Sequence, residues 1–163
     1  MIYLVRHAHA GPKQDWHGPD ELRPLSAKGH RQAYGLATEL RPYPVGLIVS
    51  SPAVRCRQTV EPVAAHRGMG TVVDDRLAAG SDLTAILAAV LRPFGCDALV
   101  CTHGEVIGRL FDELRARGAG VSRRSRRGKG ATWLLELDGD AVVRVRYRPA
   151  RQAAVPGYLA STG

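Results

Sequence analysis

The sequence predicts an α/β fold, a three-layer α/β/α sandwich around a central, mostly parallel sheet of about six strands. Six short apolar runs are bounded by turn residues, helical stretches separate the first five runs, and an Asp-Gly turn separates the last two. Alternating strands and helices favour a parallel sheet with helices on both faces, and the turn at 137–140 predicts a terminal hairpin. The expected strands are 2–5, 46–50, 71–73, 98–101, 132–137 and 142–147.

Four helices are expected between these strands. Ser26 is placed to cap the first helix and Asp82 the third, because their side-chain oxygens can accept from free amide groups at a helix start. Pro62 marks a point where the second helix could kink or break. The fourth opens with an acid and ends with basic residues and a glycine, as the helix dipole favours. The expected ranges are 26–40, 53–66, 83–91 and 105–117.

Composition is typical of a globular protein. The chain has 163 residues, of which 45% are hydrophobic, so one domain over 1–150 can bury a core. The tail at 151–163 is expected to be irregular. No apolar run approaches the roughly 18 residues of a membrane span, and no signal peptide is recognisable. Three cysteines argue against a disulfide framework and favour the cytoplasm.

The formal net charge is +8, which suits anionic small molecules, membrane surfaces or nucleic acid. A GC-rich coding bias is an alternative cause, because Arg far outnumbers Lys and Asn is absent. Five cations lie within 122–129, including Arg124 and Lys129. This segment is either a distal phosphate or acidic-partner site or a solvated loop. Sequence-specific binding to nucleic acid is not expected, because no DNA-reading motif accompanies the charge.

Three of the predicted strands end in a cation or an imidazole. Arg6 and His7 follow the first strand, Arg55 follows the second, and His103 follows the strand at 98–101. Ligands of open α/β sheets bind at the carboxyl ends of the strands. If these strands are neighbours, two guanidinium groups and two imidazoles meet in one pocket suited to a phosphoryl group.

Residues 4–8, 50–59 and 102–105 resemble, in order and spacing, the three signature segments of the histidine phosphatase (phosphoglycerate mutase-like) superfamily. Residues 23–29 resemble a fourth, linking segment. The resemblance spans roughly residues 2–148 and is greatest to small members typified by phosphohistidine phosphatases. The stretch 128–133 is similar to the phosphatase domain that some bacteria fuse to a Nudix hydrolase, although no Nudix segment is present here.

The residue types predict distinct roles at this pocket. His7 is the expected nucleophile, because a neutral imidazole can accept a phosphoryl group if its other nitrogen is held. Arg6 and Arg55 are the expected phosphate clamp, since guanidinium forks match phosphate oxygens. His103 would donate to a phosphoryl oxygen. No metal or cofactor is implied, and a His-x-His metal site with His9 is disfavoured, because barrels with that motif need about 250 residues.

Further contacts with substrate are expected from loops. Ser51 could donate to the phosphate, and Gly104 would let the backbone approach it closely. Trp16 and His17 could contact a base or a peptide, or belong to an ordinary surface loop. Ala8 departs from the glycine common in the family, which would be costly if its φ were positive.

The general acid is the weakest part of the prediction. Larger family members carry a Glu soon after the third strand, where this chain has Ala78 and Ala79. Asp82 and Glu105 are the remaining candidates. A missing acid favours a leaving group that departs readily, such as the imidazole of phosphohistidine.

The sequence therefore predicts a metal-independent phosphatase that works through a phosphohistidine intermediate on His7. Its substrate would be protein phosphohistidine or a small phosphorylated metabolite or nucleotide. A mutase is less favoured, because the chain has little insertion length for a lid. The alternatives are a non-catalytic phosphate-binding or basic interaction module that retains the clamp, and nonspecific binding of nucleic acid through residues 123–129.

Overall fold

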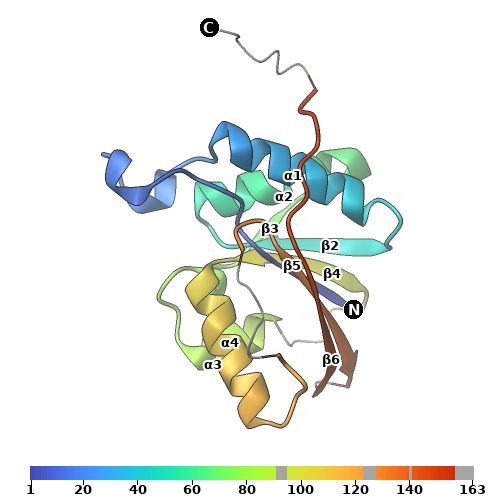
Figure 1. The fold of residues 1–163 in the computed structure, drawn as a ribbon. Helices are drawn as coiled ribbons and strands as arrows, with labels where there is room; N and C mark the ends of the chain where they lie inside the picture. The colour runs from blue at the N-terminus through green and yellow to red at the C-terminus, as the bar shows by residue number, and fades with distance from the viewer. Residues whose placement is uncertain (91–94, 123–127, 140, 157–163) are drawn as a thin grey trace, which may run out of the picture.

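A computed structural model describes residues 1–90, 95–122, 128–139 and 141–156. Six strands form one sheet in the order β3-β2-β4-β1-β5-β6 (Figure 1). Strands β1, β2, β3 and β4 run parallel to one another. Strand β5 runs antiparallel to β1 and to β6, with which it forms the terminal hairpin. Their bounds are β1 Ile2–Arg6, β2 Val45–Ser50, β3 Val72–Val73, β4 Asp97–Thr102, β5 Thr132–Asp138 and β6 Ala141–Arg148.

Helices cover both faces of the sheet, which confirms the predicted three-layer fold. Helices α1 (Ala27–Leu40) and α2 (Val54–Arg67) lie on one face, and α3 (Leu83–Val90) and α4 (Gly104–Ala116) lie on the other (Figure 1). Strand β1 alternates between two cores, as a two-residue period requires. Its Ile2 and Leu4 belong to the α3–α4 core, and its Tyr3 and Val5 belong to the α1–α2 core.

The helix boundaries follow the expected signals. The Ser26 hydroxyl accepts a hydrogen bond from the Gly29 amide at 3.2 Å, and the Asp82 carboxylate accepts one from Ala85 at 2.8 Å. Pro62 does not break α2, which continues to Arg67. Residue 91, the predicted end of the third helix, lies outside the described residues. Three 3₁₀ helices were not predicted: η1 Lys13–Asp15, η2 Asp20–Leu22 and η3 Asp75–Leu77.

The strand order determines where the site forms. Strand β4 lies between β1 and β2 and runs parallel to both, with Arg6 opposite Thr102 and Ser50 opposite Cys101. The three carboxyl ends therefore meet at one edge of the sheet. The residues that follow these strands, His7, Ser51 and His103, become neighbours there.

Residues 149–156, which follow β6, contain neither helix nor strand. This segment packs on α1: the Ala153 amide donates to the Arg31 carbonyl at 3.0 Å. A Cβ on Gly35 would lie 2.3 Å from the Arg151 carbonyl oxygen, so only glycine allows this approach. No helix among the described residues is long and apolar enough to span a membrane.

Candidate active site

His7 follows β1 and lies at the floor of the site, with 6% of its surface exposed. Its amide donates to the Thr102 carbonyl at 2.9 Å, which holds the backbone against β4. Its Nδ1 lies 2.8 Å from the Ala8 carbonyl oxygen. Because a carbonyl only accepts, Nδ1 carries the proton and Nε2 carries the lone pair. Among the described residues, no group is hydrogen-bonded to Nε2.

Burial lowers the pKa of His7 to about 3. The hydrogen bond to Ala8 opposes this shift, whereas the positive charges of Arg55, His103 and Arg6 add to it. The imidazole is therefore neutral over the physiological pH range. A neutral ring with a fixed tautomer is the form that can attack phosphorus.

A residue absent from the predicted site, Thr59 of α2, holds the backbone beside His7. Its hydroxyl accepts from the Ala8 amide at 2.9 Å and donates to the Arg55 carbonyl at 2.6 Å. None of the described non-glycine residues has a positive φ, so alanine causes no backbone strain at position 8. Thr59 thus connects the nucleophile loop to the helix turn that carries Arg55.

Arg55 is in the first turn of α2 and is 4% exposed. Its Nη1 donates to the Asp20 carbonyl at 2.5 Å, and its Nη2 lies 3.1 Å from the Asp20 carboxylate and 3.3 Å from Nδ1 of His103. Its buried Nε has no hydrogen-bond partner among the described residues. A buried guanidinium with an unused N–H retains a donor for a ligand.

His103 immediately precedes α4 at the N-cap position, and its ring lies 5.5 Å from that of His7, edge to face. Since Arg55 donates to Nδ1 of His103, Nε2 bears the ring proton and donates to the Ser51 hydroxyl at 2.9 Å. The sequence predicted that Ser51 and His103 contact the phosphate. In this structure both lie at the site, and each is hydrogen-bonded to the other.

Arg6 lies beneath the first turn of α4. A Cβ on Gly104 would lie 2.8 Å from both Cζ and Nε of Arg6. The close approach expected at Gly104 is therefore an approach to the guanidinium. This contact places Arg6 beside the positive end of the α4 dipole and next to His7 in the chain.

Asp20 and Arg23, in the loop before α1, belong to the site but were not predicted. Arg23 is 8% exposed, and its Nε donates to the Asp20 carboxylate at 2.9 Å. Its Nη1 donates to the carbonyls of Ala10 and Gly11 at 3.0 and 3.1 Å. Burial raises the pKa of Asp20, but hydrogen bonding to Arg23 and the charge of Arg55 outweigh it and lower the pKa. The only sign of such a role in the sequence was the position of Arg23 at the start of the linking segment 23–29.

Comparison with known proteins agrees with this geometry. The model of the histidine phosphatase superfamily (branch 1) matches residues 2–79, which include His7, Arg55 and the Arg23 segment. The chain belongs to the histidine phosphatase superfamily. An 8-oxo-(d)GTP phosphatase of Mycolicibacterium smegmatis is 31% identical over 147 residues, which are 86% of this chain and 46% of the relative. This histidine phosphatase chain thus spans less than half of that protein.

Solved structures share the fold of this histidine phosphatase. A tungstate complex of the protein histidine phosphatase SixA has a TM-score of 0.72 at 20% identity and covers 93% of this chain and 96% of its own. A Nakamurella multipartitia structure assigned as phosphohistidine phosphatase SixA has a TM-score of 0.63 at 29% identity and covers 82% of each chain. A Shigella dysenteriae protein assigned as phosphoglycerate mutase GpmB is 35% identical over 82 residues, 47% of this chain and 36% of that protein.

Neither predicted general acid is hydrogen-bonded to His7, Arg55 or His103. Asp82 is exposed and caps α3 through its hydrogen bond to Ala85. Glu105 is exposed in the first turn of α4. The carboxylate that the structure does place beside the clamp is Asp20, and its two guanidinium partners favour the ionised form. Asp20 is therefore poorly suited to donate a proton.

Lys129 is brought to the site by the turn before β5. The Gly130 amide donates to the carbonyls of Arg6 and His7, both at 3.1 Å, and the Lys129 carbonyl accepts from Gln32 at 3.1 Å. Burial lowers the pKa of Lys129, and the charges of Arg6, Arg23 and Arg55 lower it further. Arg124, the other predicted cation of this segment, lies outside the described residues.

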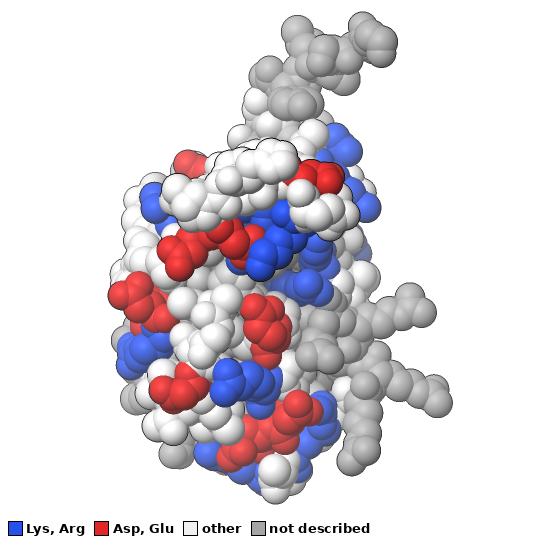
Figure 2. All heavy atoms as spheres, turned by 90° about the vertical axis from the view of Figure 1, so that its left-hand side faces the viewer, with Lys and Arg blue, Asp and Glu red and all other residues white. Residues whose placement is uncertain are grey.

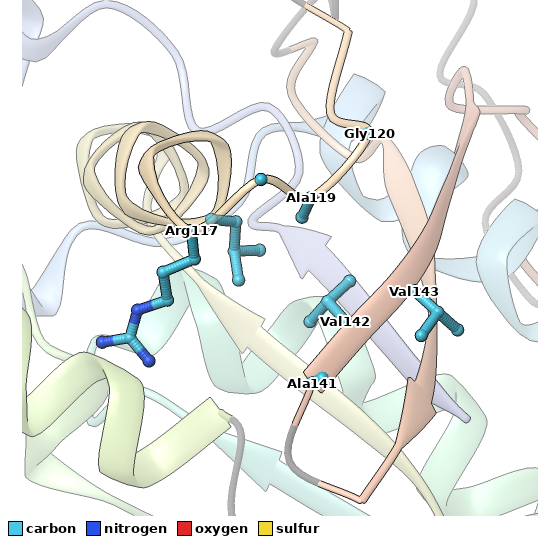
Figure 3. Close-up of a pocket in the computed structure, with 8 residues that line it drawn as sticks. Arg117, Ala119, Gly120, Ala141, Val142 and Val143 are labelled. Carbon is cyan, nitrogen blue, oxygen red and sulfur yellow. The ribbon is translucent and has the colours of Figure 1, made fainter.

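One pocket lies beside Trp16, a predicted substrate contact, and another lies between the end of α4 and β6. Trp16, whose indole donates to the Pro19 carbonyl at 3.0 Å, shares a hollow of about 200 Å³ with Arg23 and Ser26. A groove of about 440 Å³ lies between the end of α4 and β6 (Figure 3). Because α4 runs from the His103 end of the sheet to the opposite edge, that groove is remote from His7. It is lined by Leu114, Arg117, Gly118, Ala119, Gly120, Ala141, Val142 and Val143.

Proposed function

We propose that this chain is a metal-independent phosphatase in which Nε2 of His7 takes the phosphoryl group and water then hydrolyses the phosphohistidine. The single observation that carries the proposal is the state of His7. Its Nδ1–H is held by the Ala8 carbonyl at 2.8 Å and its pKa is lowered to about 3. This leaves a neutral, oriented nitrogen nucleophile beside the buried guanidinium group of Arg55 and the half-buried one of Arg6.

The proposed reaction has two steps. Nε2 of His7 forms a bond to phosphorus while the bond from phosphorus to the leaving group breaks, and the leaving group departs with that electron pair. A water molecule then attacks the phosphohistidine, the P–N bond breaks, and inorganic phosphate and neutral His7 are regenerated. Arg6 and Arg55 would stabilise the charge that spreads over the equatorial oxygens, so no metal ion is needed for that role.

His103 would change partners when a phosphoryl group enters. It now donates from Nε2 to Ser51 at 2.9 Å and accepts from Arg55 at Nδ1. A dianion placed between the two imidazoles would draw the Arg55 guanidinium toward itself and away from Nδ1 of His103. Ser51 would then hold the ring in place, or turn its own hydroxyl to the phosphate.

The substrate classes that we propose are protein phosphohistidine and a small phosphorylated metabolite or nucleotide. The SixA fold similarity supports the first, and the relative named 8-oxo-(d)GTP phosphatase supports the second. The imidazole of phosphohistidine departs readily and needs no strong general acid, whereas the alkoxide of an alkyl phosphate does. Three free thiols, of which Cys56 and Cys101 are buried, support a reducing, cytoplasmic location.

The competing proposal is a module that binds phosphate through the same clamp without catalysis. The lack of a suitable carboxylic acid beside His7 favours it. The fixed tautomer and low pKa of His7 favour catalysis, because a binding site gains nothing from a held lone pair.

Hydrolysis of p-nitrophenyl phosphate in excess EDTA tests the proposal, with wild type beside His7→Ala. An aryl leaving group needs little acid assistance, so we expect turnover by wild type and loss of it in the variant. A phosphorylated His7 trapped by rapid acid-free quenching would identify the intermediate. Turnover by neither protein would favour the binding module, and turnover that survives in His7→Ala would exclude His7 as the nucleophile.

A further inference from the structure

Several cationic side chains gather around His7. Arg6, Arg23, Arg55 and Lys129 surround the site, and Asp20 is the carboxylate among them. Figure 2 shows Lys and Arg side chains gathered in a hollow beneath a ridge of uncharged residues on this side of the molecule. A phosphate monoester brings about −1.5 to −2 charge, so a more highly charged substrate fits better.

Lys129 is held where a second anionic group would lie. Its neighbour Gly130 has a φ of +77° and donates its amide to the carbonyls of both Arg6 and His7. The Lys129 carbonyl accepts from Gln32, whose amide oxygen accepts from the His9 backbone at 2.9 Å. The backbone of Lys129 is therefore fixed from two sides within one residue of the contact with His7. Its ammonium lies near enough to Arg6, Arg23 and Arg55 for their charges to lower its pKa.

The lack of a proton donor points to the same kind of substrate. Asp20 is ionised between two guanidinium groups, and Asp82 and Glu105 are exposed at helix starts. An alkoxide leaving group would need a proton in the transition state. A phosphate leaving group is a far weaker base and can depart as an anion, provided that a cation receives its charge.

We infer that the site hydrolyses a phosphoric anhydride, as in a nucleoside diphosphate or triphosphate, and that Lys129 binds the leaving phosphate. The inference rests on the proposed function and names its substrate class. His7 Nε2 bonds to the terminal phosphorus, and the bond from that phosphorus to the bridging oxygen breaks. The electron pair stays on the bridging oxygen, now part of the leaving phosphate beside Lys129. Water then releases inorganic phosphate from His7.

The test compares substrates that differ only in the second phosphate. Wild type and Lys129→Ala are assayed in EDTA with ADP and inorganic pyrophosphate, and with AMP and p-nitrophenyl phosphate. We expect Lys129→Ala to lower kcat/KM for ADP and pyrophosphate by about 10- to 100-fold, as loss of a charge-assisted hydrogen bond implies. For AMP and p-nitrophenyl phosphate we expect a change within about 3-fold. Lys129→Arg, which keeps the charge, should restore most of the activity on ADP.

Lys28→Ala is the matched control, because Lys28 is an exposed lysine in the first turn of α1 and its loss changes net charge equally. We expect it to change kcat/KM for every substrate by less than about 3-fold. Equal losses on monophosphates and diphosphates in Lys129→Ala would overturn the inference, as would wild-type turnover of p-nitrophenyl phosphate without turnover of ADP or pyrophosphate. In both cases the phosphatase itself would stand. Absence of turnover on all four substrates would overturn the phosphatase proposal as well.

Discussion

Asp20 and Arg55 are joined twice: the Asp20 carboxylate lies 3.1 Å from Nη2 of Arg55, and the Asp20 carbonyl oxygen lies 2.5 Å from Nη1. Asp20 also accepts from Arg23 at 2.9 Å. A carboxylate of the chain thus occupies the guanidinium that the proposed phosphate clamp requires. An entering anion must compete with Asp20, while the second bond, to the backbone, can keep Arg55 oriented.

Asp20→Asn should strengthen anion binding. Removing the negative charge frees Nη2 of Arg55 and leaves the backbone bond intact, so we expect the inhibition constant of inorganic phosphate to fall by about 3- to 10-fold. The neighbouring, exposed Glu21 provides the control, and Glu21→Gln should leave this constant within about 2-fold. Weaker phosphate inhibition in Asp20→Asn would mean that the carboxylate mainly positions the clamp.

The low pKa of His7 makes stability depend on pH. The folded-state pKa is about 3, below the ordinary value of 6.5, so between these values the unfolded chain binds the extra proton. Stability is therefore complete above pH 6.5 and is lost as pH falls toward 3. We expect this group to cost about 2 kcal/mol between pH 8 and pH 5.

Urea unfolding of wild type and His7→Gln at both pH values measures this cost. The variant should lose about 2 kcal/mol less than wild type over the interval. His17→Gln, a substitution in the exposed loop, should lose as much as wild type. Parallel pH profiles for wild type and His7→Gln would show that His7 is not buried as a neutral ring.

Gly104→Ala should impair catalysis without unfolding the chain. The added Cβ would lie 2.8 Å from the Arg6 guanidinium, which must shift, whereas alanine is otherwise favourable in a helix. We expect kcat/KM for p-nitrophenyl phosphate to fall by about 10- to 100-fold, with a Tm within a few degrees of wild type. Glu105→Ala, one residue further along the same turn, should stay within about 3-fold, and an equal loss in both would refute the steric account.

Thr59→Val tests a positioning role. Valine keeps the shape but removes the hydrogen bonds to the Ala8 amide and the Arg55 carbonyl. We expect kcat to fall by about 10-fold, with a much smaller change in KM, because the backbone that orients Nδ1 of His7 loses its support. Thr59→Ser retains the hydroxyl and should restore kcat. Loss of activity in Thr59→Ser to the same extent would indicate a packing role for the methyl group instead.

Local signals were sufficient for much of the fold. The runs at 2–5 and 98–101 are fully apolar and form buried strands, and Ser26 and Asp82 cap helices as their side-chain oxygens predicted. Pro62 was less informative, because α2 continues past it to Arg67. The short 3₁₀ helices were missed, since three residues carry too little periodicity to detect.

The positions of His7, Arg55 and His103 follow from the sequence, because a run of apolar residues sets each strand end and parallel neighbours share an edge. The excess of cations and the absence of a glutamate near residues 78–79 are also visible in the sequence alone. The partners of these groups depended on contacts between distant segments. Asp20 reaches Arg55 across 35 positions and Ser51 reaches His103 across 52, and no local pattern encodes such separations. Only the tertiary structure decided the tautomer of His7, the hydrogen-bond partners of Arg55 and the placement of Lys129. These depend on burial and on side chains that meet in three dimensions.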